Sequence, residues 1–188
     1  MNLETLEYPP LTEDIEEAKN HLDKYGMALI ANVLSFDEID EMDKRLNEQF
    51  LGEEKYKVGS KIRGDEGLGV ESSDEEKVSR LVWNLINKGD CFLKLIDHPK
   101  ILPLIQHIIG EKVCLCSMGA HMNGSGNERM ALHQDQWPLV PHPMDFPFMA
   151  NVMYLISDNS PENGGTRLIP GSHTVSYTHL RAHETVGN

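Results

Sequence analysis

The apolar residues near the start of the chain repeat with the spacing of an amphipathic helix. In residues 12–25 the apolar side chains fall on one stripe, Thr12 is a residue type that begins helices, and Gly26 is one that ends them. The apolar run at residues 27–33 then predicts a strand. The members of the helical stripe are Ile15, Ala18, Leu22 and Tyr25.

A second helical signal begins at Ser35, because a serine followed three residues later by Glu38 forms a capping box. A third helix is predicted over residues 99–109, with a proline near its start and Gly110 at its end. From periodicity alone, we infer only that the first two helices pack on something apolar. The predicted buried face of the second helix consists of Phe36, Ile39, Met42, Leu46 and Phe50.

Most of the remaining apolar segments are short and predict strands. These strands are expected at residues 80–85, 112–118, 151–157 and 166–169. Residues 52–79 are polar, charged and interrupted by glycines, so we predict a surface loop there.

Composition narrows the class of protein without naming its chemistry. The chain has 188 residues, which suits one domain with a real core, and its net charge of −13 argues against a general binder of nucleic acids or anionic membranes. No apolar run approaches the roughly 20 residues of a membrane helix, and the first residues lack a signal-peptide pattern. We therefore expect a cytoplasmic protein. Its three cysteines, Cys91, Cys114 and Cys116, are predicted to be buried free thiols.

The candidate chemistry centres on His133 and Asp135. Side chains two residues apart on a strand point to the same face, with Cα atoms about 6–7 Å apart. An imidazole and a carboxylate placed side by side are two thirds of the 2-His-1-carboxylate set that binds Fe(II) on one face. A chain with nine histidines contains such a pair by chance often enough that its context must support the assignment.

That context is a second motif further along the chain. Residues 161–165 read Pro-Glu-Asn-Gly-Gly, which is strong turn chemistry, and residues 169–173 read Ile-Pro-Gly-Ser-His. Together with the Leu-His-Gln-Asp of residues 132–135, this arrangement resembles the phytanoyl-CoA dioxygenase family. The resemblance runs from about Tyr8 to His173.

The resemblance implies a fold and an activity. The fold would be α+β, with N-terminal helices packed on a double-stranded β-helix, a jelly-roll or cupin-like barrel. The activity would be an Fe(II)- and 2-oxoglutarate-dependent dioxygenase that hydroxylates a small organic substrate with O2. His133 and Asp135 would be the catalytic iron ligands. 2-Oxoglutarate would chelate the iron and be converted to succinate and CO2.

Two more residues are candidates for cofactor binding. Asn151 begins a predicted strand whose Asn151, Met153 and Leu155 share a face, so it would contact 2-oxoglutarate, its substrate, or a neighbouring strand. Trp137 opens a proline-rich loop over residues 137–148 that would wall or cover the pocket, or Trp137 would only anchor that loop.

Three further residues invite a role at the site, and for each we favour a simpler reading. His121 lies in a predicted loop, and His173 follows a strand end in the family, whose ligand histidine comes later. Lys88 would reach a carboxylate near the site or remain a solvated turn lysine.

The family pattern also needs a distal histidine and an arginine for 2-oxoglutarate, which belong to the second half of the barrel. We expect residues 1–174 to be a partial domain without that half. Residues 175–188 resemble the translation of a sequencing adapter, so we expect a non-native tail. His179, Arg181 and His183 are therefore not taken as the missing residues, and the fragment is expected to be inactive.

Two other functions stay open. One is a non-catalytic β-barrel binding protein, in which His133 and Asp135 form a hydrogen-bonded core pair. The other is a cupin-type metalloenzyme that does not use 2-oxoglutarate. A halogenase is disfavoured, because those relatives have a small residue where Asp135 stands. A small molecule is the expected partner, with no nucleic acid and no membrane, and the oligomeric state is left open.

Overall fold

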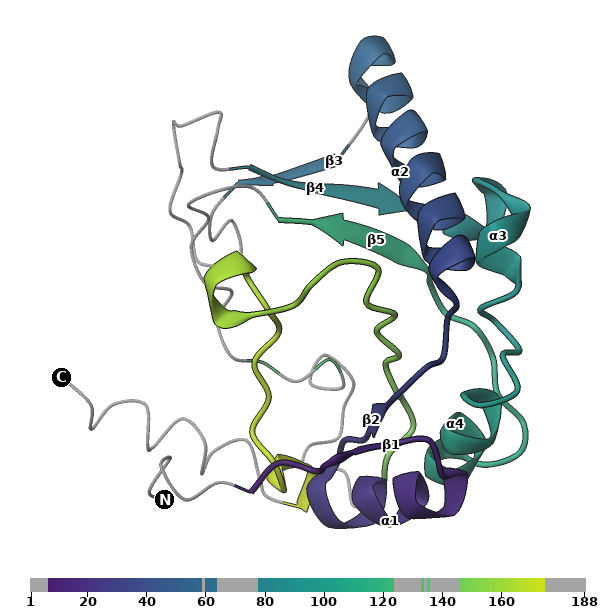
Figure 1. Ribbon diagram of the computed structural model, residues 1–188, viewed down its shortest axis with the longest axis vertical. Helices are drawn as coiled ribbons and strands as arrows, with labels where there is room; N and C mark the ends of the chain where they lie inside the picture. The colour runs from purple at the N-terminus through teal and green to yellow at the C-terminus, as the bar shows by residue number, and fades with distance from the viewer. Residues whose placement is uncertain are drawn as a thin grey trace, which may run out of the picture.

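The computed structural model describes residues 7–58, 60–63, 78–123, 133, 135 and 146–174. Helices and strands are mixed along this chain and gather toward two ends of the molecule (Figure 1). One end holds a long helix and a three-stranded sheet, and the other holds two helices beside a two-stranded pair. The helices are α1 (Ile15–Tyr25), α2 (Phe36–Tyr56), α3 (Asp90–Leu93) and α4 (Leu102–Ile109).

Helix α1 begins later than the sequence predicted. Asp14, and not Thr12, is its N-cap, because the Asp14 carboxylate accepts a hydrogen bond from the Glu17 backbone N–H at 2.9 Å. Thr12 instead belongs to a strand, and its hydroxyl accepts a hydrogen bond from the Asp14 backbone N–H at 3.1 Å. The helix ends at Gly26, as predicted, in the left-handed region at φ 73°.

The strand predicted at residues 27–33 is only two residues long. It is β2 (Leu29–Ile30), which pairs in parallel with β1 (Leu11–Thr12). Helix α4 confirms the third predicted helix, although it begins at Leu102, with proline in its first turn and Gly110 after its end.

Helix α2 confirms the predicted capping box. The Glu38 carboxylate accepts from the Ser35 backbone N–H at 2.8 Å, and the Ser35 hydroxyl accepts from the Glu38 backbone N–H. The hydrogen bonds from the Ser35 backbone and then from its side chain lower the pKa of Glu38. Phe36 was wrongly predicted to be buried and is 86% exposed. With 3.6 residues per turn, it lies about 80° from the centre of the stripe that does reach the core.

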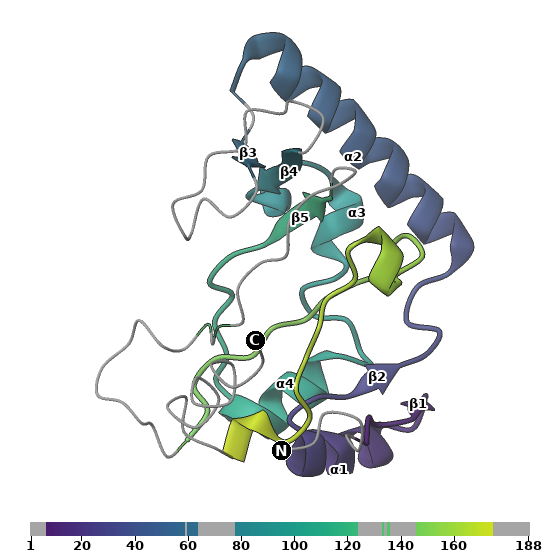
Figure 2. The same cartoon turned by 90° about the vertical axis from the view of Figure 1, so that its left-hand side faces the viewer.

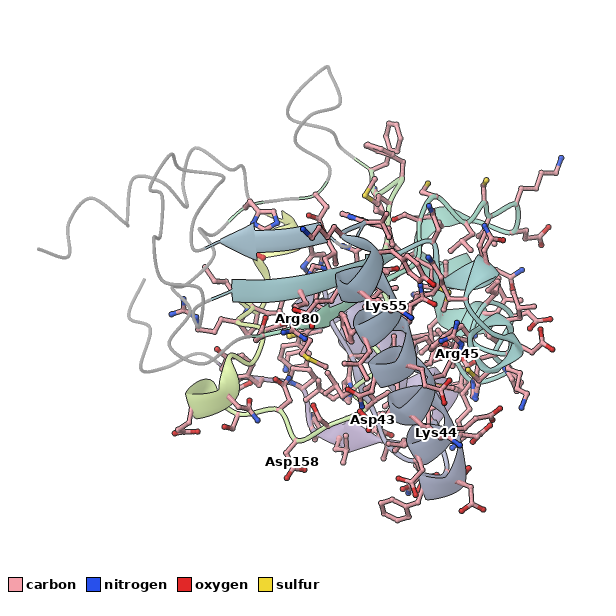
Figure 3. All side chains as sticks on the ribbon, turned by 90° about the horizontal axis from the view of Figure 1, so that it is seen from above. Asp43, Lys44, Arg45, Lys55, Arg80 and Asp158 are labelled. Carbon is pink, nitrogen blue, oxygen red and sulfur yellow. The ribbon has the colours of Figure 1, made fainter. Side chains whose placement is uncertain are left out.

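The core lies between α2, α3 and the sheet. The side chains that form it come from all three, and Val82, Met42 and Phe92 are at most 2% exposed. Figure 3 shows Arg80 of the sheet beside α2, and its guanidinium lies 3.4 Å from the Glu54 carboxylate. The buried cluster is Met42, Leu46, Phe50, Val82, Leu85, Cys91, Phe92 and Leu95.

The sheet has the order β3-β4-β5 and is antiparallel throughout. Strand β4 (Val78–Trp83) confirms the strand predicted at residues 80–85, two residues earlier. Strand β3 (Ser60–Arg63) corrects the surface loop predicted over residues 52–79, as does helix α2, which continues to Tyr56. A polar sequence does not exclude a strand at a sheet edge, where one face meets solvent.

The strand predicted at residues 112–118 is not formed, because these residues pair with no strand among the described residues. The strand is instead β5 (Gly119–Met122), whose first residue pairs with Trp83, the last residue of β4. Beyond that point β4 has ended, so residues 112–118 have no strand to pair with there. Cys114 and Cys116 are free thiols, as predicted, but they are exposed, and only Cys91 is buried.

Residues 146–174 pass between the two ends of the molecule and return to α1 (Figure 2). The predicted strands at 151–157 and 166–169 are extended here without ladder partners, and the described ranges contain no closed barrel. Within the same ranges, no helix is long and apolar enough to cross a membrane.

Candidate metal centre

The structure brings His133 and Asp135 together. The imidazole Nε2 lies 3.2 Å from Oδ1 of the carboxylate, and the two side chains are 46% and 48% exposed. The two side chains therefore face each other, although His133 lies in no strand and Asp135 lies in a turn rather than in the predicted strand. The pair is open to solvent, so a metal ion or a small molecule has access to it.

The spacing of the two donor atoms fits a single metal ion. Imidazole nitrogen and carboxylate oxygen bind such ions at about 2.1 Å, and two such bonds at a right angle place the donors about 3.0 Å apart. The observed 3.2 Å is close to this value, and it also suits a direct ion pair. Among the described residues, no group of three or more His, Cys, Asp or Glu side chains is placed to hold a metal. Whether His133 and Asp135 are ligands stays a prediction.

Asn151 joins this pair. Its side-chain amide donates a hydrogen bond to Oδ2 of Asp135, the oxygen that does not face His133. The sequence placed Asn151 near the site and left its contact open between 2-oxoglutarate, the substrate and a neighbouring strand. A contact with 2-oxoglutarate or the substrate stays a prediction, while the contact with Asp135 is an observed feature.

The chain around Asn151 is fixed from its other face. The Tyr154 hydroxyl donates to the Leu95 carbonyl at 2.8 Å, and burial raises the pKa of this tyrosine to about 12. Tyr154 and Ile156 pack against the core, whereas Met153 and Leu155 are 57% and 54% exposed. Asn151, Met153 and Leu155 therefore lie on the face away from the core, which confirms that they share a side.

The Pro-Glu-Asn-Gly-Gly motif forms the predicted turn. Residues Pro161–Asn163 make a short 3-10 helix, and Gly164 follows with φ 84°. The Asn123 amide donates to the Gly164 carbonyl at 3.0 Å, and a Cβ on Gly164 would lie only 2.7 Å from that amide nitrogen. The turn is thereby attached to the residue that follows β5.

The Pro-Gly-Ser-His motif is attached to helix α1. The Gly171 backbone N–H donates to the Tyr25 carbonyl at 2.7 Å, and the His173 Nε2 lies 3.1 Å from the Asp23 carbonyl. The imidazole also lies against Gly26. His173 therefore has a structural contact at the C-terminus of α1, and its exclusion as a ligand stays a prediction.

The other residues considered from the sequence are accounted for as follows. His121 lies in β5 rather than in a loop, and burial lowers its pKa. Lys88 forms an ion pair of 3.1 Å with Glu53 of α2. Trp137 lies outside the described residues, as do His179, Arg181, His183 and most of the loop at residues 137–148.

Comparison with known proteins shows which family contains these motifs. The family model described as phytanoyl-CoA dioxygenase matches residues 22–186, which is most of the chain and includes both motifs. The chain belongs to the phytanoyl-CoA dioxygenase family. The match runs into residues 175–188, so the non-native origin of that segment stays a prediction.

Two proteins that are similar to this chain are named as dioxygenases. A protein named "Dioxygenase af480" from Aspergillus fumigatus is 29% identical over 163 residues, which are 87% of this chain and 50% of the relative. A "Probable alpha-ketoglutarate-dependent hypophosphite dioxygenase" from Stutzerimonas stutzeri is 26% identical over 169 residues, covering 84% of this chain and 53% of the relative. The chain thus spans about half the length of these relatives. No solved structure gives a significant match.

Proposed function

We propose that this protein, in its full length, is an Fe(II)- and 2-oxoglutarate-dependent dioxygenase that hydroxylates a small organic substrate. The observation that supports it is the 3.2 Å contact between His133 Nε2 and Asp135 Oδ1, inside a chain of the phytanoyl-CoA dioxygenase family. The name of the relative from S. stutzeri supports 2-oxoglutarate as the co-substrate. The complete fold in this proposal is a double-stranded β-helix barrel.

In this proposal His133 and Asp135 hold the iron, and a third ligand comes from outside the described residues. The imidazole would bind the ion through Nε2, and the carboxylate would offset part of the charge of the cation. When bound, the iron with 2-oxoglutarate supplies the oxidative chemistry, which the protein does not perform itself. The chain's own contribution is to hold two donors at a spacing that one ion can bridge.

The first prediction tests these two ligands in the full-length protein. His133→Ala and Asp135→Ala are each expected to abolish succinate formation from 2-oxoglutarate, because each removes a ligand from an exposed pair that supports little of the core. Succinate release is measured with iron, ascorbate and candidate substrates, and thermal unfolding is measured in parallel. His173→Ala serves as a matched control, because that histidine contacts α1 and should leave most of the turnover intact.

The same assay separates the alternative functions. Near wild-type succinate release by either ligand variant would remove the iron assignment. Metal-dependent turnover that does not need 2-oxoglutarate would favour a cupin-type enzyme. A wild-type protein that binds no metal would favour a non-catalytic binding protein, with His133 and Asp135 as an ion pair.

A further inference from the structure

Asp135 has a contact at each of its carboxylate oxygens, and the two contacts differ in kind. Oδ1 faces His133 Nε2 at 3.2 Å, a spacing that a metal ion can bridge. Oδ2 accepts a hydrogen bond from the Asn151 amide. The amide N–H donates to Oδ2 and not to Oδ1, so an ion bound at Oδ1 would leave this second contact in place. The carboxylate is therefore oriented before any ligand arrives.

The orientation matters because a carboxylate has two ways to bind a metal. With Oδ2 held by an amide, only Oδ1 is presented, on the side of His133. A carboxylate that is free to rotate would lose rotamer entropy on binding, or would bind through both oxygens and occupy a position that a co-substrate needs. Hydrogen bonds to metal-binding carboxylates commonly have this effect.

Asn151 is itself held by contacts that do not involve the site. Three residues later, Tyr154 donates to the Leu95 carbonyl at 2.8 Å, and Ile156 packs on the same core from the same face. The segment that carries the amide is thus held against the core. A link of this kind connects the packed part of the molecule to the exposed pair.

We infer that Asn151 is a positioning residue, which orients Asp135 so that a metal ion is bound by one carboxylate oxygen together with His133. This inference rests on the proposed metal site and adds to it a residue that does not touch the metal. It also differs from two of the roles left open by the sequence, in which the Asn151 amide would contact 2-oxoglutarate or the substrate directly.

The experiment measures metal binding without turnover, using Mn²⁺ alone as the probe. Free Mn²⁺ is counted by its electron paramagnetic resonance signal while the full-length protein, which supplies the third ligand of the proposed site, is titrated. Losing a hydrogen-bond partner of a metal ligand typically weakens affinity about 10- to 100-fold. We expect this loss in Asn151→Ala and in Asn151→Leu, which restores the size of the side chain without its amide. Asn151→Gln keeps an N–H donor and should recover part of the affinity.

Two controls make the result specific. Asn47→Ala removes another exposed amide, which donates to the Asp43 carboxylate at 3.0 Å on α2, and it should leave Mn²⁺ affinity unchanged. His133→Ala removes a ligand and should abolish binding.

The outcomes separate the inference from the function on which it rests. Equal affinities of the wild type, Asn151→Ala and Asn151→Leu, with binding lost in His133→Ala, would overturn the inference and leave the metal site standing. Full affinity in Asn151→Leu alone would show that bulk, and not the amide, matters, and would overturn it as well. If the wild type binds no Mn²⁺, the metal site fails and the inference fails with it.

Discussion

The part of the molecule that forms the core and the part that carries the candidate site are stabilised in different ways. Around α2, the side chains of Met42 and Phe92 are 2% exposed and Val82 is fully buried. Beside the site, apolar side chains of the segment that carries Asn151 remain in contact with water, and Met153 and Leu155 are 57% and 54% exposed. Stability resides in the first region and the candidate chemistry in the second.

The difference follows from how helices and strands satisfy their backbones. A helix makes its backbone hydrogen bonds within itself and needs neighbours only to bury its apolar face. An extended segment needs a neighbour for its backbone hydrogen bonds and for its apolar face. The extended segments are instead attached by a few side-chain contacts: Tyr154 to Leu95, Asn123 to Gly164, and His173 to the end of α1. Breaking one such contact should therefore loosen these segments before it unfolds the core.

The largest stability effect should come from the core. Phe92→Ala is expected to lower the free energy of unfolding by about 3–5 kcal/mol, because it leaves a cavity where a large ring was fully enclosed. Phe36→Ala is the matched control, since that ring is 86% exposed and its loss should change stability by no more than about 0.5 kcal/mol. Urea unfolding followed by circular dichroism measures both. Similar losses in the two variants would contradict the division into core and site.

An intermediate effect is expected at the contact between α1 and the Pro-Gly-Ser-His motif. Gly26→Ala forces a side chain into the left-handed region at φ 73°, and its Cβ would lie 2.4 Å from Nδ1 of His173. The backbone strain costs about 1–2 kcal/mol, and displacing the imidazole removes a hydrogen bond of about 1 kcal/mol. We therefore expect a loss of about 2–3 kcal/mol, with faster proteolysis near residues 166–174.

A double-mutant cycle separates the two causes. His173→Ala removes the clash. The losses of unfolding free energy in the two single variants should therefore sum to more than the loss in the double variant. Gly110→Ala is the control for strain alone, because that glycine has φ 94° with nothing within 4 Å of an added Cβ. Strictly additive losses would mean that His173 is not held against α1.

The helical part of this fold could be predicted closely because its signals are local. The capping box of Ser35 and Glu38 and the glycines after α1 and α4 mark helix ends within a few residues of the sequence. Phe36 was wrongly assigned to the buried face because it lies at the edge of the apolar stripe. The first turn of a helix can also extend past the element against which the rest of the helix packs.

The strands were harder to predict because their partners are distant in sequence. Residues 112–118 alternate like a strand, yet β5 begins only at Gly119, where Trp83 of β4 offers a partner. The two-residue spacing of His133 and Asp135 was enough to predict that they meet. The alternation of residues 151–157 gave the face of Asn151, but not Asp135 as the acceptor of its amide, because that contact depends on how separate segments pack.

The smallest effect concerns Tyr154, which fastens the chain beside Asn151. Tyr154→Phe keeps the ring and removes the hydroxyl that donates to the Leu95 carbonyl at 2.8 Å, so we expect a loss of about 1 kcal/mol near neutral pH. In the same variant, Mn²⁺ affinity should fall only slightly if the packing of Ile156 still holds the segment.

The contribution of Tyr154 to stability should depend on pH in a known direction. Burial raises the pKa of Tyr154 from 10.0 to about 12 in the folded chain, so folding favours the neutral phenol. Its contribution is therefore fully present below about pH 10, the pKa of an unfolded tyrosine, and is lost as pH rises toward 12. The difference in unfolding free energy between the wild type and Tyr154→Phe should shrink or reverse between pH 8 and pH 11.5, while groups common to both proteins cancel. Parallel curves for the two proteins across that range would mean that Tyr154 is not buried against Leu95.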